Sequence, residues 1–455
     1  MKNTISISRI ILIILAIQFS YLSAPAQSLQ PDTLYASLFS STNSAVHVNS
    51  NSGTEEVQAE KSENLFNRQL LSGDWGGIRS FLNETGFNFE FVYKADLFSN
   101  LYGGFQRGTK YLDNIDLIFS ADLGTSLNWN NTNLTVHFLG NGGGSPCELV
   151  GASQGISNIE TTPTWKLYQL LLEKKFFDEK FSVAIGLYDL NSEFDMRATS
   201  GIFINPSHGI GYDFAKSGLN GPSIFPTTSL AVRWKYQTGN GNYFQSAILD
   251  GVPGNPDNPF GTHINLNKNE GFLVATEYGI VELDEEVQKS KIAIGSWIYT
   301  SQSEANDIYS VGSQTRLENN YGFYVTAERI LYSKFDTPQL GLTGFIRLGV
   351  ANPNVNPVDF YLGAGFKFSG LLDKESNDAL GLAMAFSHNS KKYRNVAEIK
   401  GEFIKEYEIN FEATYKFQLT PWLMLQPDLQ YIINPSYCTN SNSAFVIGSR
   451  IEIIF

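Results

Sequence analysis

The chain has 455 residues, of which 42% are hydrophobic, 17% are charged and 13% are aromatic, and its formal net charge is −13. This length suits two or three soluble domains or one large barrel. The acidic balance argues against nucleic acid as a partner, because phosphate binding depends on lysine and arginine.

The N-terminus has the pattern of a secretory signal peptide. Lys2 and Arg9 come before a short apolar run, "IILIILAI" (10–17), and a small-residue cleavage sequence ends at Ala26. The run is shorter than the roughly 20 residues that a membrane-spanning helix needs. Residues 1–26 are therefore predicted to be a signal peptide that takes the protein out of the cytoplasm.

Two segments precede the first predicted strand. Residues 27–64 are rich in Ser, Asn, Thr and Gln and have no apolar period, which predicts a polar disordered extension. In residues 65–86, Ser72 or Asp74 can cap a short helix and Gly86 can end it. This second segment is predicted to be a short periplasmic helical element.

The remainder of the chain, residues 87–455, alternates polar and apolar side chains with the period of two that β-strands show. The stretch "EYEINFEATYKFQLT" (406–420) does so almost throughout. About 16 such stretches are found, each near the 9–11 residues that a tilted strand needs to cross a membrane. They begin near Phe87, Tyr111, Leu134, Trp165, Phe181, Ser229, Asn242, Glu270, Ser290, Tyr321, Leu340, Pro357, Ala379, Lys405, Trp422 and Ala444.

The period alone does not say whether the apolar faces meet a soluble core or lipid, but the loops favour lipid. Short turns at one end and long loops at the other are typical of outer-membrane barrels. Short turns occur at 178–181, 238–242 and 419–422, and long polar stretches at 141–164, 189–228, 251–268, 301–318 and 389–404. We therefore expect an all-β transmembrane antiparallel barrel, and about 16 strands leave a water-filled channel that points to transport.

Five longer motifs are specific enough to compare with a known family. They are "GDWGGIR" (73–79), "GLYDLNSEFD" (186–195), "GIGYDFAKSGLNGPSIFPTTSLAVR" (209–233), "LDGVPGNP" (249–256) and "TPWLMLQPDLQYIINP" (420–435). From about Leu70 to Phe455 the chain resembles the carbohydrate-selective porins of the OprB type. The resemblance implies a 16-stranded porin of the bacterial outer membrane, often trimeric, that passes monosaccharides by facilitated diffusion.

The longest loop, 189–228, is the candidate for a constriction that folds back into the lumen. A sugar pore needs planar polar groups for hydroxyls and aromatic surface for C–H faces, and opposed charges across a pore disfavour bulky apolar solutes. The alternative is that Asp189 and Asp195 pair with Arg197 and hold the fold of the loop itself. The candidate constriction residues are Asp189, Asn191, Glu193, Asp195, Arg197, Asp213, Phe214 and Lys216.

A second set of candidates is predicted from strand alternation to face the lumen: Glu90, Lys94, Asp96, Arg233, Lys235, Arg347, Glu408 and Glu412. No metal site is predicted, because "DLNSEFD" has Phe194 and Ser200 where a calcium loop needs glycine and glutamate. The five histidines are scattered, and the sequence contains no G-x-S-x-G or C-x-x-C motif. We therefore expect no cofactor and no enzymatic activity.

Three functions are compatible with these patterns. The first is passive diffusion of monosaccharides and similar small polar solutes, and the second is a general or ion-admitting porin without a dedicated sugar site. The third is a soluble glycan-binding protein or an outer-membrane hydrolase, for which His208 or His388 would be the base. The expected partners are small sugars, outer-membrane lipid and further copies of the chain in a homotrimer. Whether Cys147 and Cys438, both in predicted outward loops, form a disulfide is left open.

Overall fold

The computed structural model describes residues 65–284, 287–306, 316–334, 337–372, 378–435 and 441–455. The predicted signal peptide, the polar extension and Cys438 lie outside these described ranges. In the part of the chain that is described, no helix is both long enough and apolar enough to cross a bilayer.

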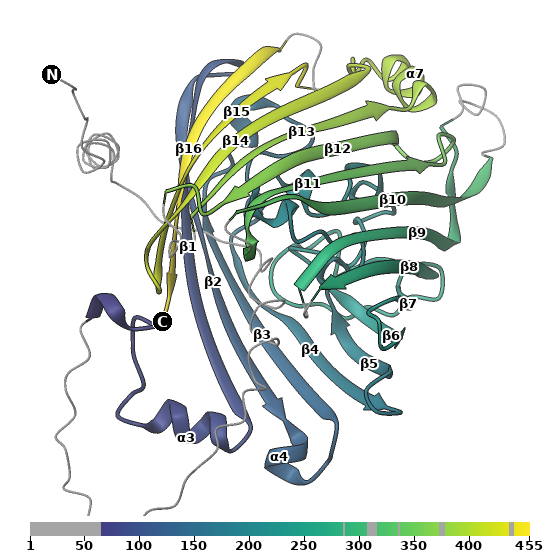
Figure 1. Ribbon diagram of the computed structural model, residues 1–455. Coiled ribbons are helices and arrows are strands. Elements are labelled where there is room, and N and C mark those ends of the chain that lie inside the picture. Colours follow the sequence, from purple (N-terminus) through teal and green to yellow (C-terminus); the bar gives the residue numbers. More distant parts are fainter. Residues whose placement is uncertain (1–64, 285–286, 307–315, 335–336, 373–377, 436–440) are drawn as a thin grey trace, which may run out of the picture.

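Sixteen antiparallel strands form one closed barrel in the described ranges (Figure 1). Each strand pairs with its neighbours in sequence, and β1 pairs with β16 to close the sheet. A closed sheet has no edge strand, so every strand has hydrogen-bond partners on both sides. A bilayer requires this, because it offers no water to unpaired N–H and C=O groups. The strands are β1 (Phe87–Gly104), β2 (Gly108–Asp122), β3 (Thr132–Gly143), β4 (Thr164–Phe176), β5 (Phe181–Tyr188), β6 (Ser229–Gln237), β7 (Tyr243–Asp250), β8 (Phe272–Asp284), β9 (Val287–Glu304), β10 (Leu317–Lys334), β11 (Thr337–Ala351), β12 (Val358–Ser369), β13 (Ala379–Asn389), β14 (Tyr407–Thr420), β15 (Leu423–Ile433) and β16 (Asn442–Ile454).

Short helices occupy the connections. The N-terminal segment contains η1 (Leu65–Asn67) and α3 (Ile78–Glu84), and the connections contain α4 (Leu123–Leu127), α5 (Cys147–Val150), η2 (Leu190–Ser192), η3 (Ser200–Ile202), η4 (Pro206–His208), α6 (Tyr212–Ala215) and α7 (Lys391–Ile399). Helices α3 and α4 lie at the end of the barrel with the short turns, and α7 lies at the opposite end (Figure 1). By the habit of bacterial barrels the short-turn end is periplasmic.

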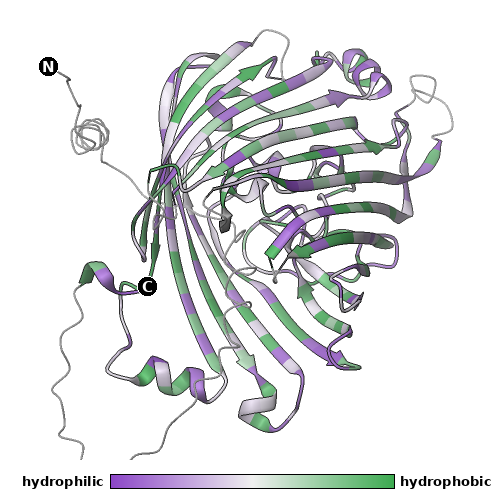
Figure 2. Cartoon of the chain, viewed as in Figure 1, coloured by the Kyte–Doolittle hydropathy of each residue, from purple (hydrophilic) through white to green (hydrophobic). Residues whose placement is uncertain are grey.

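The predicted sidedness of the strands is confirmed, and β14 shows it clearly. Glu408, Asn410 and Glu412 are almost completely buried inside the barrel, whereas Phe411 and Leu419 on the other face are exposed. The same alternation of hydrophilic and hydrophobic residues runs along the strands in Figure 2. The apolar side chains therefore form the outer surface that meets lipid, and the polar ones line or fill the interior.

Loop lengths segregate as predicted, with some exceptions. The turn between β2 and β3 contains α4, because Asp122 caps this helix by accepting a hydrogen bond from Gly124 N at 2.8 Å. At the long-loop end, the connections at 105–107 and 352–357 are short. The alternation of polar and apolar residues predicts where the strands run. It does not predict that a capped helix lengthens the connection between two of them.

The segment before β1 packs against the seam where the barrel closes. Leu71 N donates a hydrogen bond to Ile454 O at 2.9 Å, and Arg79 Nη2 donates to Phe455 O at 3.0 Å. Phe455 N in turn donates to Phe91 O at 2.9 Å. The guanidinium of Arg79 also lies 4.2 Å from the centre of the Trp75 ring. The "GDWGGIR" motif thus joins the start of the barrel to the last residue of the chain.

We expect Arg79→Ala to weaken this seam. The change removes a hydrogen bond from a charged donor and a cation–π contact, which should cost about 1.5–3 kcal/mol. The measurement is the urea midpoint of the folded, heat-modifiable band on a gel. Arg107→Ala is the control, because Arg107 is exposed at the other end of the barrel. Equal midpoints for the two variants would contradict a role for Arg79 in closure.

Candidate functional site

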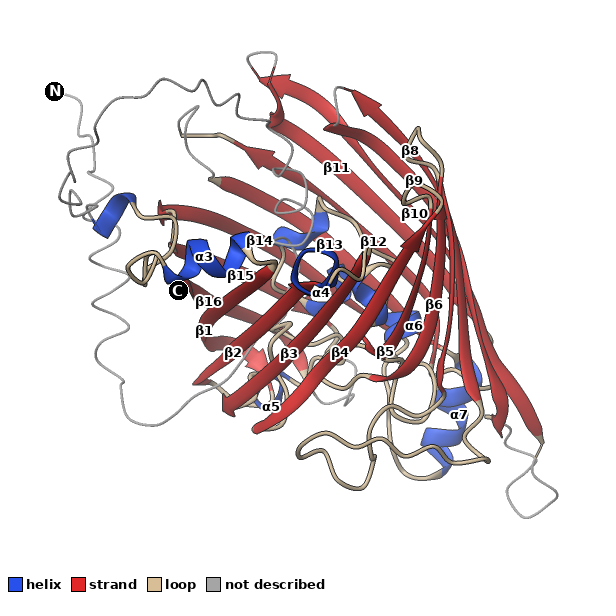
Figure 3. Ribbon diagram, turned by 90° about the horizontal axis from the view of Figure 1, so that it is seen from below, coloured by secondary structure: helices blue, strands red, loops and turns tan. Residues whose placement is uncertain are grey.

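Two long loops enter the barrel, not only the one predicted. Loop 189–228 lies in the lumen as expected, and its helix α6 is seen inside the ring of strands in Figure 3. Loop 144–163 also turns inward: Ser157 Oγ donates to Asp96 on β1 at 2.7 Å, and Gln430 Nε2 on β15 donates to Ile156 O at 2.8 Å. The sequence analysis expected this second loop to lie outside.

Glutamates on the barrel wall hold these loops by their backbone. The carboxylate of Glu408 accepts hydrogen bonds from two consecutive N–H groups of loop 144–163, those of Ser153 (2.8 Å) and Gln154 (2.9 Å). Glu412 does the same for Ile204 (2.5 Å) and Asn205 (3.0 Å) in loop 189–228. Glu328 on β10 accepts from the N–H groups of Ala198 and Thr199. Irregular backbone inside a barrel needs such acceptors, because its N–H groups lack ladder partners.

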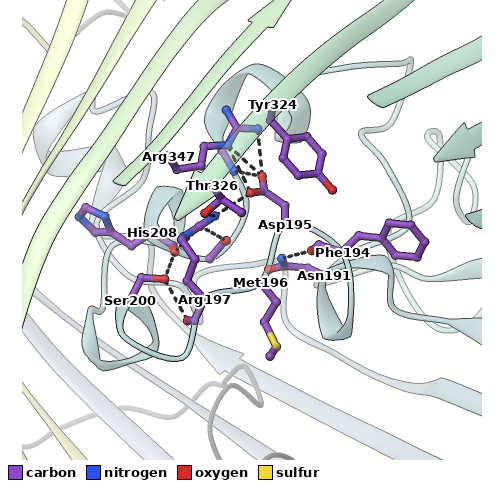
Figure 4. Close-up of polar contacts among 12 residues, drawn as sticks. Asn191, Phe194, Asp195, Met196, Arg197, Ser200, His208, Tyr324, Thr326 and Arg347 are labelled. Carbon is purple, nitrogen blue, oxygen red and sulfur yellow. Dashed lines mark hydrogen bonds and ion pairs between the residues drawn. The ribbon is translucent and has the colours of Figure 1, made fainter. Parts of the chain in front are cut away.

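An ion-pair network fixes the middle of loop 189–228 (Figure 4). Arg347 on β11 is fully buried and pairs with Asp195 at 2.9 Å and with Asp213. Asp195 also pairs with Arg197 at 2.6 Å, and Arg197 donates to the backbone oxygens of His208 (2.9 Å) and Gly209 (2.6 Å). The structure therefore brings together four residues that the sequence placed in two separate sets.

The charge of Asp195 is maintained by this network. Burial alone would raise the pKa of its carboxyl group, but Arg347 and Arg197 hold that pKa below its usual value. For Asp213 the balance goes the other way: burial raises its pKa, and Arg347 only partly offsets the effect. The loop is thus fastened by a buried cation between one firmly ionised carboxylate and one that is easier to protonate.

A second network ties the start of the loop to the wall. Glu193 pairs with Arg233 at 2.6 Å and with Lys235 at 3.3 Å, and Tyr188 Oη donates to it at 2.7 Å. Arg233 also pairs with Glu173 at 2.8 Å. Although burial opposes ionisation, Lys235 and Arg233 lower the pKa of Glu193 to about 2. The two cations therefore favour the ionised form of Glu193.

Aromatic packing supports the loop from a third side. Phe214 is fully buried and stacks on Trp297 of β9 with ring centres 4.9 Å apart and planes within 3°. Near this stack, Glu277 on β8 accepts hydrogen bonds from Asp195 N (2.8 Å), Tyr243 Oη (2.6 Å) and Tyr324 Oη (2.6 Å). The sequence analysis did not single out Glu277 or Trp297. The only indication in the sequence was that both residues occupy inward-facing positions of strands that are rich in small residues.

The other predicted residues lie apart from these networks. Asp189 accepts a hydrogen bond from Asn191 N at 2.9 Å and so caps η2, whereas the alternative interpretation had it pair with Arg197. Asn191 Nδ2 donates to Phe194 O at 3.0 Å. On the wall, Glu90 accepts from Asn88, Lys94 pairs with Glu452 at 3.2 Å, and Asp96 pairs with Arg450 at 2.7 Å.

A cavity of about 650 Å³ lies on the long-loop side of the constriction. Its walls combine amides such as Asn220 and Asn255 with the apolar surfaces of Phe225 and several prolines. Lys216 also lines this cavity, which we call the vestibule, and its side chain is exposed there. Amides and apolar ring surfaces are the two kinds of group that a sugar requires. Among the described residues, no group of three or more His, Cys, Asp or Glu side chains could hold a metal ion.

His208 is buried in the constriction. Its ring lies against those of Phe203 and Phe345, with centres 4.8 and 5.9 Å apart. Its Nε2 is 3.9 Å from Glu412, whose carboxylate already accepts two backbone hydrogen bonds from the loop. Burial, and then the charge of Arg197, lower the pKa of His208 to about 3. The imidazole is therefore neutral while the loop is in place.

We expect acidification to loosen loop 189–228 through His208. In a released loop the histidine would have its ordinary pKa near 6.5, so only the released state binds a proton between pH 6.5 and pH 3. The attachment of loop 189–228 to the barrel is therefore unaffected above pH 6.5. As the pH falls below this value, the free energy of attachment becomes less favourable, by about 2–3 kcal/mol at pH 4.5. Single-channel current noise should rise over this range, and His208→Phe should suppress the rise. His263→Phe, in the vestibule, is the control; similar noise in both variants would contradict the assignment.

A closed sixteen-stranded barrel with an apolar outer face and loops folded into a polar lumen is a porin of the bacterial outer membrane. Residues 106–455 match the family described as carbohydrate-selective porin, OprB family, and the chain belongs to this family. Family and fold point to a channel rather than to an enzyme.

Individual relatives agree with this assignment. The chain is 26% identical to Porin B of Pseudomonas aeruginosa over 86% of its own length and 92% of the relative. It is 22% identical to the putative porin QuiX of Acinetobacter baylyi, over 85% and 93%. Among solved structures, the high-pH structure of Pseudomonas putida OprB has a TM-score of 0.76 at 21% identity, covering 86% of this chain and all of that one.

Proposed function

We propose that the protein lets monosaccharides and similar small polar solutes diffuse passively across the outer membrane, with loop 189–228 as the constriction. The observation that carries the proposal is the attachment of this loop across the lumen by Arg347, Asp195 and Asp213. A loop fixed by buried charges keeps a constant aperture, and the vestibule in front of it offers amides and apolar rings. The family assignment supports carbohydrate as the solute class.

The test is solute entry into proteoliposomes. Purified protein in planar bilayers should give stable conductance steps that monosaccharides reduce, and liposomes that contain it should take up radiolabelled sugars. A folded protein that gives neither conductance nor uptake would refute the proposal. Substituting Asp195 and Arg197 together tests whether loop 189–228 selects among sugars. If the uptake rates of different sugars change relative to one another, the selective part of the pore is in this loop. If all uptake rates change by the same factor, it is elsewhere.

One observation favours a second candidate, a general or ion-admitting porin without a dedicated sugar site. The four charged residues of the first network, Asp195, Arg197, Asp213 and Arg347, are buried in ion pairs with one another, so they face the protein rather than a solute. In that case the networks set only the width of the pore. Liposome swelling with sugars of equal size distinguishes the two, because rates that depend on size alone favour the general porin.

We also propose that the chain is processed and assembled as the sequence patterns suggest. Residues 1–26 would be removed on export, and three copies would associate through the apolar outer surface of the barrel. The support is the signal-peptide pattern and the resemblance to porins that are often trimeric. N-terminal sequencing of the mature protein and its mass in mild detergent test the two statements separately.

A further inference from the structure

A buried lysine forms part of the wall of the vestibule. Lys166 is the third residue of β4 and lies near the long-loop end of this strand. Its neighbour Trp165 is exposed on the outer face of the barrel, whereas Lys166 is only 8% exposed and lines the cavity. Because successive side chains of a strand leave opposite faces, Lys166 points inward. A charged group therefore faces the space through which solutes approach the constriction.

Three loops meet around Lys166. Its ammonium group donates a hydrogen bond at 3.4 Å to Thr227 Oγ1, in the loop between β5 and β6. The loop between β7 and β8 is fastened to the next residue of β4, because Thr262 Oγ1 donates to Leu167 O at 2.9 Å. Thr161, from the loop between β3 and β4, lines the same cavity. The ammonium group is therefore placed where these loops together shape the vestibule.

Lys166 has no carboxylate partner among the described residues. No described carboxylate oxygen lies within 4.0 Å of its Nζ, or of the Nζ of Lys216, the other lysine of the cavity. Glu304, at the end of β9, is the one carboxylate among the described lining residues, and it forms no ion pair with either lysine. The described wall of the vestibule thus carries more cations than anions.

This burial leaves Lys166 able to bind an anion. An ammonium group has three N–H donors, and Thr227 accepts from one of them. Taking a cation out of water is costly unless an opposite charge is supplied. A carboxylate or phosphate in the vestibule would supply that charge and accept from the remaining donors, and hydrogen bonds between two charged groups are the strong ones. The neighbouring amide of Asn255 and the ring of Phe225 suit the remainder of a sugar.

We propose that Lys166 binds the anionic group of an acidic monosaccharide, a carboxylate or a phosphate, in the vestibule before the solute reaches the constriction. The inference rests on the proposed passage of monosaccharides and narrows it to an anionic class. In a cavity with walls of low dielectric constant, fixed cations raise the local concentration of anions by about tenfold or more. Lys216 adds to this field from the same cavity. The compact charge of a lysine binds either anion without a fixed geometry.

The first experiment compares two sugars of nearly equal size that differ in charge. Glucuronate and glucose are added to the long-loop side of single channels in planar bilayers, at constant ionic strength, and the block of the ion current is titrated. In wild-type protein the half-blocking concentration should be about tenfold lower for glucuronate than for glucose. K166Q should abolish this difference and leave the block by glucose unchanged, whereas K166R keeps the charge and should keep most of it. The control is K391Q, which removes an exposed charge from α7 at the same end of the barrel.

A second measurement separates ligand binding from a structural role of Lys166. Replacing a buried, unpaired charge by an apolar side chain of similar length should not lower stability, so K166M should have a urea midpoint at or above that of wild type. A ligand that binds the folded state raises the midpoint. Glucuronate should therefore raise the midpoint of wild-type protein more than glucose does, and it should leave the midpoint of K166M unchanged. Equal increases in the two proteins would place the anion site elsewhere.

Glucose 6-phosphate, used beside glucuronate, shows whether phosphate or carboxylate is the preferred group. If K166Q keeps the wild-type ratio of half-blocking concentrations for both anions, the inference is wrong, while uptake of glucose leaves the proposed function standing. If wild-type protein passes no sugar, the proposed function fails. The urea midpoints with and without glucuronate then still decide whether Lys166 binds an anion.

Discussion

Replacing Arg347 by alanine is expected to free loop 189–228 and to convert the stable conductance of the channel into a larger, fluctuating one. Arg347 is fully buried between Asp195 and Asp213, and its guanidinium lies 5.2 Å from the Tyr324 ring centre. Removing the arginine leaves the buried Asp213 without its cation and leaves Asp195 with Arg197 alone, which should cost about 3–5 kcal/mol. Single-channel recording in planar bilayers measures the conductance, and urea titration of the folded band measures the stability.

The Arg347 prediction has an internal control. In the double variant R347M/D213N one cation and one anion are removed together, and Asp195 keeps its ion pair with Arg197, so no uncompensated charge remains. This variant should recover much of the stability that Arg347→Ala loses, although the loop keeps fewer anchors. Unchanged conductance in Arg347→Ala would mean that the other attachments of the loop suffice. In that event the constriction would depend on its other attachments, those to Glu412, Glu328, Glu277 and Arg233.

Glu277→Ala is expected to be similarly damaging, although Glu277 contacts the loop only through the backbone. Its carboxylate accepts hydrogen bonds from Asp195 N and from the hydroxyl groups of Tyr243 and Tyr324, all of which are buried. Each donor left unsatisfied should cost about 1–3 kcal/mol, so the total should be at least about 3 kcal/mol. The urea midpoint of the folded band and the noise of the open channel report the effect.

Two further variants separate the chemistry of Glu277 from its size. Glu277→Gln keeps the shape of the side chain and one acceptor oxygen, and it should lose less stability than the alanine variant. Glu282→Gln makes the same change at an exposed position of the same strand and should stay within about 0.5 kcal/mol of wild type. If the Glu277→Ala protein has the same urea midpoint and the same open-channel current noise as the Glu282→Gln protein, water replaces the lost acceptor.

The strands and their facing could be predicted from the sequence because both are local properties. Alternation along 406–420 alone places Glu408 and Glu412 inside and Phe411 outside, as the structure has them. The predicted first residues of most strands are within a few positions of the observed ones. A strand that crosses a bilayer has little freedom: one face must be apolar, and the length is set by the membrane.

The networks inside the lumen could not be predicted, because they join distant residues. Asp195 and Arg347 are 152 positions apart, and nothing near either residue indicates the other. The inward path of loop 144–163 depends in the same way on Asp96 and Glu408. Glu277 was missed for another reason: Ala275 and Gly279 flank it on the inward face, so the polar phase of β8 is weak. Contacts of this kind require the closed barrel to be known first.

The paired acceptors on the wall have a consequence for how such a channel could diversify. Glu408, Glu412 and Glu328 accept hydrogen bonds from main-chain nitrogen, which every amino acid except proline offers with a hydrogen. At the loop positions that they hold, the attachment is therefore largely independent of the side chain present. New side chains could therefore be tried at the aperture, and solute preference altered, while the aperture itself stays in place. Proline at 153, 154, 198, 199, 204 or 205 is the substitution that this arrangement cannot absorb.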